Sequence, residues 1–455
     1  MIVKQFYTSC LSQASYYIES DGEAAVIDPS RDIDNFINIS RKNNSIIKYI
    51  FQTHFHADFV SGHITLSKKT NAPIIYGPKA DPLYDFVLAN EGDLFSIGKV
   101  SLKLIHTPGH TLESCCYLLF DENNRQHSIF TGDTLFLGDV GIPDVAQRYK
   151  GLNKEDLAGI LFDSINKKIK PLDDNITVYP GHGAGSACGK NMMSETVDSL
   201  KNQKIVNYSL NGDFSKIEFI KELTDNLPKP PGYFSANVKM NQDGYEDLEV
   251  VIKNSMKKIL PTLFKDLIKQ PNIVLLDTRE THEYIKYHIP NSIFVGLNGR
   301  FAPWVGSIVK DVNTALIVVC RSKKELEVFT RLSRIGFDSS VGFINIDKKE
   351  DIFPYSDVNS LNSVSPADFV NISQDTNVYD VRSISEFSNG SYNNAFNIPL
   401  NELEDNLNLI KNDSYVYCAG GYRSLIACSL LVKRGKKNIT NILEGYSGIK
   451  QYNAC

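Results

Sequence analysis

The chain has 455 residues, of which 42% are hydrophobic and 22% are charged, and its formal net charge at pH 7 is −5. This composition is typical of a globular protein, and at roughly 150 residues per domain the length predicts about three domains. The small negative charge gives no reason to expect nucleic acid or an anionic membrane as a partner. No stretch approaches the ~20 consecutive apolar residues that cross a bilayer, and the N-terminus lacks the basic-then-apolar layout of a signal peptide. The eight cysteines are scattered and too few for a disulfide scaffold, so we expect a reduced, cytoplasmic protein.

Residues 1 to about 190 alternate short β-rich runs with turn signals. Most of the strand patterns end at or near a His or Asp, often beside a Gly, which predicts a sheet that presents polar side chains along one rim. The runs are 24–30, 46–54, 72–78, 100–110, 127–133 and 176–182. Residues 153–169 carry apolar side chains at helical spacing, and residues 190–255 indicate helices and a Pro-rich loop (227–234) that close the domain.

Six candidate metal ligands lie at the ends of these strands or in the loops just after them. They are His54, His56, Asp58, His110, Asp133 and His182. Residues at i and i+2 of an extended segment point the same way, so the first three can converge on one point. In THFHADFVSGH (53–63) the position after Asp58 is Phe59, and a phenyl ring cannot ligate a metal.

The motifs THFHAD, HTPGHT, FTGDTLF and YPGHG resemble those of the metallo-β-lactamase fold. The resemblance implies an αβ/βα sandwich with a metal site at one rim. Dinuclear zinc hydrolases of this fold, glyoxalase II among them, usually read His-x-His-x-Asp-His, and the last His holds the second metal. Because Phe59 stands at that position, we expect one metal per chain.

Within this fold the site is similar to that of the persulfide dioxygenases. That resemblance implies one Fe(II) held by His54, His110 and Asp133, a two-His, one-carboxylate set with open coordination positions. His56, Asp58 and His182 would then orient the ligands and hydrogen-bond to water or substrate. A three-His zinc site that includes His56 remains the alternative.

One stretch departs from that pattern. After TLF the family tends to carry Gly-Arg-Pro-Asp, whereas this chain has Gly141, Ile142, Pro143 and Asp144. The missing arginine removes a cation that could support a loop or a substrate carboxylate.

The second half of the chain contains an internal repeat. IVLLDTRETHEY (273–284) and NVYDVRSISEF (377–387) share Asp-x-Arg with a Glu six residues after the Asp. Downstream, residues 315–337 and 414–435 each read as a strand, a cysteine, a short loop and an amphipathic helix. Because order and spacing both agree, two copies of one α/β unit are predicted.

The loop CAGGYRS (418–424) of the second copy follows a strand and opens a helix. Gly420 and Gly421 let backbone N–H groups turn inward as an anion-binding nest, and the helix N-terminus and Arg423 add positive charge. These features favour a thiolate or persulfide at Cys418. The loop resembles the active loop of a rhodanese, a sulfurtransferase that carries sulfur as a cysteine persulfide. The remaining loop residues are Ala419, Tyr422 and Ser424.

The first copy has a different loop, CRSKKEL (320–326). It keeps Cys320 but lacks glycine, and Glu325 stands where Arg423 stands in the second copy. A carboxylate there repels a thiolate, so we interpret this copy as a degenerate rhodanese with a structural or interface role, although Lys323 and Lys324 offer some compensation. Cys188, six residues beyond His182 in a Gly-rich loop, either meets incoming sulfur or packs that loop, and both interpretations stay open.

The predicted fold class is α/β, with a metallo-β-lactamase sandwich at 1–255, a degenerate rhodanese-like domain at 256–358 and an active rhodanese domain at 359–455. This order resembles fusions of a persulfide dioxygenase with a sulfurtransferase. It implies oxidation of a low-molecular-weight thiol persulfide by O₂ to sulfite, and thiosulfate formation through Cys418. The alternatives are a zinc thioester hydrolase of the glyoxalase II type joined to a rhodanese, and a non-catalytic role for the repeats. We also expect a homo-oligomer, with neither nucleic acid nor membrane as partner.

Overall fold

The computed structural model describes all residues except 144–147, 226, 228–229, 373–375 and 453–455. The chain divides into two compact units. The first comprises residues 1–249 with 333–336, and the second comprises residues 250–332 with 337–455. The second unit holds both copies of the repeat, so the predicted boundary at 358/359 lies inside it. Among the residues described, no helix is long and apolar enough to span a membrane.

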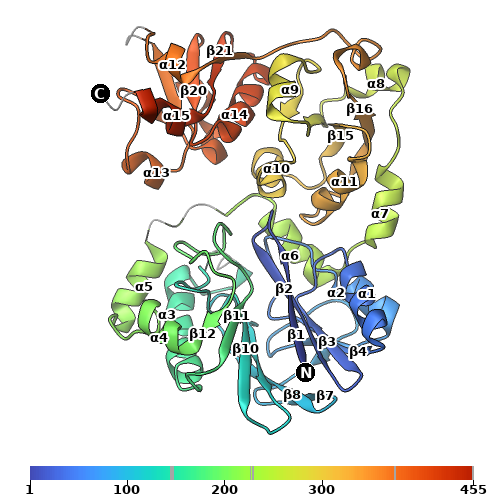
Figure 1. Cartoon of the computed structure of the whole chain (residues 1–455), viewed down its shortest axis with the longest axis vertical. Helices are drawn as coiled ribbons and strands as arrows, with labels where there is room; N and C mark the ends of the chain where they lie inside the picture. Colours follow the sequence, from blue (N-terminus) through green and yellow to red (C-terminus); the bar gives the residue numbers. More distant parts are fainter. Residues whose placement is uncertain (144–147, 226, 228–229, 373–375, 453–455) are drawn as a thin grey trace. The chain divides into compact units, whose positions relative to one another are not determined.

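The first unit contains two six-stranded sheets (Figure 1). One runs in the order β1-β2-β3-β4-β5-β6, formed by β1 (Ile2–Thr8), β2 (Gln13–Ser20), β3 (Glu23–Ile27), β4 (Ile46–Phe51), β5 (Ile74–Tyr76) and β6 (Val87–Leu88). The other runs β12-β11-β10-β9-β8-β7, formed by β7 (Leu94–Ile97), β8 (Val100–His106), β9 (Cys115–Phe120), β10 (Gln126–Gly132), β11 (Thr177–Pro180) and β12 (Asp198–Ser199).

Three clusters of buried apolar residues define the layers of this unit. One joins the facing sides of both sheets, for example Phe51 and Phe130. A second packs Phe36 and Leu66, from helices on the first sheet, against the outer side of that sheet. The third packs Leu161 and further helical residues on the outer side of the second sheet. This is an αβ/βα sandwich, and the predicted fold class is confirmed.

Six α-helices and the start of a seventh belong to the described part of this unit, and the one predicted over 153–169 ends differently from the prediction. They are α1 (Asp34–Asn43), α2 (His63–Thr70), α3 (Lys154–Ser164), α4 (Leu200–Val206), α5 (Lys216–Thr224), α6 (Phe234–Asp243) and the start of α7 (Leu248–Ser255). The helix predicted over 153–169 begins at α3, where Asn153 and Asp156 form a capping box, and ends in a π-helical turn, Ile165–Ile169.

The second unit contains two parallel sheets with one strand order in common. The first is β14-β13-β15-β16, with β13 (Ile273–Asp277), β14 (Ile293–Phe294), β15 (Ala315–Cys320) and β16 (Ser340–Asn345). The second is β19-β18-β20-β21-β17, with β17 (Asn362–Val364), β18 (Asn377–Asp380), β19 (Phe396–Asn397), β20 (Ser414–Tyr417) and β21 (Ile439–Ile442). The shared order confirms the predicted repeat.

Helices cover these sheets, as expected for parallel strands that are buried on both faces. They are α8 (Pro261–Leu267), α9 (Thr281–Lys286), α10 (Phe301–Val309), α11 (Glu325–Ser333), α12 (Pro366–Phe369), α13 (Ile384–Ser388), α14 (Tyr422–Lys433) and α15 (Gly445–Tyr452), with short 3₁₀ turns at Lys349–Asp351, Leu400–Glu402 and Glu404–Leu409.

The Asp-x-Arg motif forms the same contact in both copies, here called the Asp–Arg latch. Arg279 forms a two-pronged ion pair with Asp277 and donates to the carbonyl of Tyr287 at 2.9 Å. Arg382 pairs with Asp380 in the same way and donates to the carbonyl of Gly390 at 2.7 Å. Both latches are buried, and they tie the end of a central strand to the segment after the following helix.

Candidate functional site

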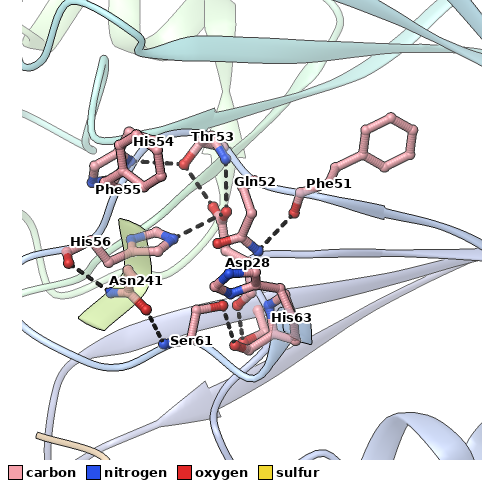
Figure 2. Close-up of polar contacts among 12 residues, drawn as sticks. Asp28, Phe51, Gln52, Thr53, His54, Phe55, His56, Ser61, His63 and Asn241 are labelled. Atoms are coloured by element: carbon pink, nitrogen blue, oxygen red, sulfur yellow. Dashed lines mark hydrogen bonds and ion pairs between the residues drawn. The ribbon is translucent and has the colours of Figure 1, made fainter. Parts of the chain in front are cut away.

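The loop after β4 carries three of the six candidate ligands, and Asp28 anchors it through hydrogen bonds to Thr53. This aspartate follows β3 with a left-handed backbone (φ 48°) and accepts hydrogen bonds from the N–H and the hydroxyl of Thr53, both at 2.8 Å. The Thr53 hydroxyl lies 2.9 Å from Nδ1 of His54, which leaves Nε2 of that ring for another partner (Figure 2). Asp28 therefore fixes where the loop leaves the sheet and which way His54 faces.

His54, His110 and Asp133 lie together, with one ligand atom from each within 4.8 Å of the others, and all three are buried. Oδ2 of Asp133 lies 3.8 Å from Nε2 of His54 and 3.6 Å from Nε2 of His110. Nδ1 of His110 hydrogen-bonds to the carbonyl of Ile142 at 2.8 Å, so that its Nε2 faces the group. Among the residues described, the buried Oδ2 of Asp133 has no hydrogen-bond partner. Two inward-facing imidazole nitrogens around an orphaned carboxylate oxygen fit a bound cation.

His182 lies between two carboxylates beside this group. Its Nδ1 is 2.9 Å from Oδ1 of Asp133 and its Nε2 is 2.8 Å from Oδ2 of Asp58. Burial alone would lower the pKa of His182, but Asp133 and Asp58 raise it well above its usual value. Burial would likewise raise the pKa of Asp133, yet His182 and His54 hold it well below its usual range. The ring therefore bridges the group to the second aspartate of the loop.

His56 points elsewhere. Its Nε2 lies 3.1 Å from Oδ1 of Asp28, and its ring lies against Phe59 with the centroids 4.4 Å apart. Burial and the neighbouring His56 lower the pKa of His54. Among the residues described, His56 does not join a group of three ligand atoms, so the geometry favours a set without it.

A second group of three lies next to the first: Asp58, His182 and Cys188, again with ligand atoms within 4.8 Å and all buried. The Cys188 carbonyl accepts a hydrogen bond from the N–H of Ile142 at 2.9 Å, and the Ile142 carbonyl contacts His110. The residue that stands in place of the family's arginine is thus buried and ties the Gly-rich loop to the metal group through its backbone. Asp144, also named in that stretch, lies outside the described residues.

Sequence reasoning missed two residues that hold this loop, Asp28 and Asn241. Asn241, on α6, donates to the carbonyl of His56 at 2.8 Å and accepts from the N–H of Ser61 at 2.9 Å (Figure 2). It also donates to the carbonyl of Phe59 at 2.8 Å. Asp28 stands at the end of a strand like the candidate ligands, and this position could have revealed it. No local signal marks Asn241, which lies some 180 residues from the loop.

The loop of the second repeat has the predicted strand–loop–helix context. Cys418 follows β20, and Gly421, with a left-handed φ of 92°, donates its N–H to the Cys418 sulfur at 3.1 Å. Beneath the loop, Gly445 approaches so closely that an added Cβ would lie 2.2 Å from the Cys418 carbonyl oxygen. The N–H of Tyr446 donates to that same carbonyl at 2.6 Å. The loop is therefore held by residues 443–447 (LEGYS) of its own repeat.

Arg423 does not face the thiol alone. Its guanidinium donates to both carboxylate oxygens of Glu386 at 2.7 Å each. Arg423 and the Ser383 N–H hold the pKa of Glu386 at about 2, against a desolvation effect that would raise it. The predicted positive charge near Cys418 is thus largely balanced by a carboxylate.

The first repeat lacks this arrangement. Burial and then the neighbouring Glu325 raise the pKa of the Cys320 thiol. Asn345 donates to Glu325 at 2.6 Å and lies 3.8 Å from the Cys320 sulfur, which fixes the carboxylate beside it. The outcome agrees with the repulsion expected from Glu325 and disfavours a thiolate here.

Comparison with known proteins finds two kinds of domain in the chain. Residues 8–182 match the model of the metallo-beta-lactamase superfamily, and the rhodanese-like domain model matches residues 260–346 and 365–452. The hydroxyacylglutathione hydrolase of Pelagibacter ubique (strain HTCC1062) is 31% identical over 226 residues, covering 48% of this chain and 81% of the relative. A probable hydroxyacylglutathione hydrolase of Schizosaccharomyces pombe is 29% identical over 220 residues, covering 46% of this chain and 80% of the relative.

Among solved structures, a metallo-beta-lactamase from Staphylococcus aureus subsp. aureus COL is similar over 75% of this chain and 98% of its own, with 30% identity and a TM-score of 0.66. Fold and site together define an αβ/βα sandwich with a His/Asp metal site, followed by two rhodanese-like domains, and both kinds of domain indicate an enzyme. The chain belongs to the metallo-beta-lactamase superfamily.

Proposed function

We propose that the chain oxidises a low-molecular-weight thiol persulfide with O₂ at one Fe(II) and makes thiosulfate through Cys418. The observation that carries this proposal is the buried group of His54, His110 and Asp133, together with a buried Phe59 at the sequence position where a dinuclear hydrolase would use a histidine. Two imidazoles and one carboxylate suit non-haem Fe(II) with open positions. A persulfide-type loop on the same chain makes sulfur the common element of both sites.

His54, His110 and Asp133 would hold the metal, which when bound would supply coordination positions for the persulfide sulfur and for O₂. His182 and Asp58 are placed to hold a proton beside the reacting sulfur, since Nε2 of His182 and Oδ2 of Asp58 lie 2.8 Å apart. Phe59, 1% exposed, keeps water from the side of the site where it packs on His56. The net reaction balances as persulfide, O₂ and one water giving thiol, sulfite and two protons.

The second step takes place at Cys418. Its thiolate attacks the outer sulfur of a second persulfide, the S–S bond of the donor breaks, and the donor leaves as a thiol. Sulfite then attacks the outer sulfur of the Cys418 persulfide, and the bond between that sulfur and Sγ of Cys418 breaks. Thiosulfate leaves, and the Cys418 thiolate is restored. The Gly421 N–H, 3.1 Å from the sulfur, is the donor placed to stabilise the negative charge in each half of the exchange.

The second candidate is a zinc-dependent thioester hydrolase of the glyoxalase II type fused to a rhodanese. Asp58, His182 and Cys188 favour it, because they form a second group of three close to the first. The named relatives are also hydroxyacylglutathione hydrolases. Two zinc ions per chain in the wild-type protein, falling to one in Cys188→Ser, would favour this candidate.

The test is O₂ uptake after glutathione persulfide or coenzyme A persulfide is added to the full chain loaded anaerobically with iron. Uptake with formation of sulfite is expected, and His110→Ala should abolish it because a ligand is lost. His127→Ala is the matched control, since His127 is exposed on β10 and outside the site, and it should retain full uptake. No uptake with either persulfide, together with tightly bound zinc, would reject the dioxygenase.

A further inference from the structure

The active loop of the second repeat is also held from the first repeat, through Tyr422. This residue directly follows Gly421 and begins α14. Its hydroxyl donates to the carbonyl of Gly296 at 2.7 Å, across the two copies of the second unit. Its ring packs against Phe294 in a T-shaped arrangement, with the centroids 6.0 Å apart.

Gly299 makes room for that ring. A Cβ added at Gly299 would lie 2.4 Å from Cζ of Tyr422 and 2.7 Å from Cε2, closer than real Cβ contacts allow. No positive φ is involved, so the requirement for glycine at this position is purely the approach of the tyrosine. The first repeat therefore contains a seat shaped for a side chain of the second repeat's loop.

The seat is itself fixed. The Leu297 N–H donates to the carbonyl of Thr278 at 3.2 Å, and Arg331 of α11 donates to the Leu297 carbonyl at 2.8 Å. The Val295 N–H donates to the carbonyl of Asp277, a member of the first Asp–Arg latch, at 2.9 Å. The segment that receives Tyr422 is thus tied to the central strand of the first repeat.

A second contact lies on the same face of α14. The Phe294 N–H donates to Oγ of Ser429 at 3.0 Å, and Ser429 is seven residues, or two helical turns, from Tyr422. Two hydrogen bonds and a ring contact hold the first two turns of α14 against the first repeat. Rotation or translation of that helix end would move Gly421, whose N–H contacts the Cys418 sulfur.

We propose that the degenerate repeat positions the persulfide loop of the active repeat, with Tyr422 as the positioning residue and Gly296 and Gly299 as its seat. The inference rests on the proposed sulfurtransferase function of Cys418. It gives the first repeat, whose cysteine loop disfavours a thiolate, a role in positioning the loop of the second. Tyr422 acts through the backbone of Gly421, whose N–H donates to the Cys418 sulfur.

The test compares Tyr422→Phe, Gly299→Ala and wild type in the full chain, with glutathione persulfide as donor and sulfite as acceptor. Tyr422→Phe removes one hydrogen bond and should lower kcat for thiosulfate formation by roughly 5-fold with KM little changed. Gly299→Ala displaces the ring and should lower kcat by on the order of 10-fold or more. In both variants the pH profile of Cys418 alkylation by iodoacetamide should shift to higher pH, which a purely structural role would not produce.

The matched control is Tyr379→Phe. Tyr379 is buried in the second repeat and donates to the carbonyl of Leu409 at 2.9 Å, away from the active loop, so kcat and the alkylation profile should stay at wild-type values. Circular dichroism checks that each variant is folded. Wild-type kcat and alkylation in both Tyr422→Phe and Gly299→Ala would overturn the inference. If wild type itself transfers no sulfur, the proposed function fails instead, and the two failures are distinct.

Discussion

Arg423 and Glu386 form a two-pronged ion pair that joins the cysteine loop of the second repeat to helix α13, with both N–O distances at 2.7 Å. Planar pairs of this kind fix direction as well as distance. The arginine is therefore held in one orientation beside Cys418. The first repeat has a related pair, since Arg321 contacts Glu283 at 2.8 Å, but Arg321 directly follows the cysteine there.

Glu386→Gln should lower the rate of thiosulfate formation by about 5-fold, because Arg423 loses its orientation. The effect should be modest, since a partly exposed ion pair contributes less than ~1 kcal/mol of free energy. The initial rate with glutathione persulfide and sulfite measures this. Glu283→Gln, which breaks the corresponding pair of the first repeat, should leave the rate unchanged. Equal losses in the two variants would mean that the pairs only support the fold.

The same pair predicts how stability varies with pH. The pKa of Glu386 is about 2 in the folded chain, against about 4.3 for an unfolded glutamate. Its stabilising contribution is therefore complete above about pH 4.3 and is lost as the pH falls toward 2. The difference in Tm between wild type and Glu386→Gln should be constant from pH 7 to pH 5 and should shrink below that. A difference that grows on acidification would contradict this assignment.

Asn241→Ala should weaken metal binding by about tenfold, because second-layer residues that orient a metal loop typically contribute that much. Losing three buried hydrogen bonds should also destabilise the protein by on the order of 3 kcal/mol. Bound iron after anaerobic loading and dialysis, together with the Tm, measures both effects.

Asn237→Ala is the control on the same helix. Asn237 is as buried as Asn241, but its amide atoms have no hydrogen-bond partner among the residues described. Its replacement should retain wild-type iron content. A comparable loss of iron in both variants would trace the effect to the packing of α6 rather than to the hydrogen bonds of Asn241.

Phe59→His should raise the capacity for zinc from one ion per chain to two. The new imidazole would stand next to Asp58, which already contacts His182, and would add a nitrogen ligand to that pair. Metal analysis after zinc loading reports the change. Phe59→Leu keeps the position apolar and should still bind one ion, so two ions in Phe59→Leu would show that the phenyl ring does not limit the site.

Much of this architecture was predictable because its signals are local. Strand patterns ending at His or Asp predicted a sheet with polar side chains along one rim, and the resemblance of the motifs around them to the metallo-β-lactamase fold implied the sandwich. Recurrence of Asp-x-Arg predicted the repeat. Contacts between distant segments carried no such signal: Glu386 was recognised as a repeat position, but its pairing with Arg423 depends on the approach of α13 to the loop. The grouping of Cys188 with Asp58 and His182 likewise depends on a Gly-rich loop whose path the sequence does not specify.

The Asp–Arg latch occurs in both copies with the same contacts, although only one copy keeps a glycine-containing cysteine loop. The motif therefore belongs to the scaffold and carries no information about turnover. A survey that identifies sulfur carriers from Asp-x-Arg alone would count copies that lack the glycine-containing cysteine loop together with copies that have it. Assignment of a catalytic role has to rest on the loop after the next central strand, where the two copies differ.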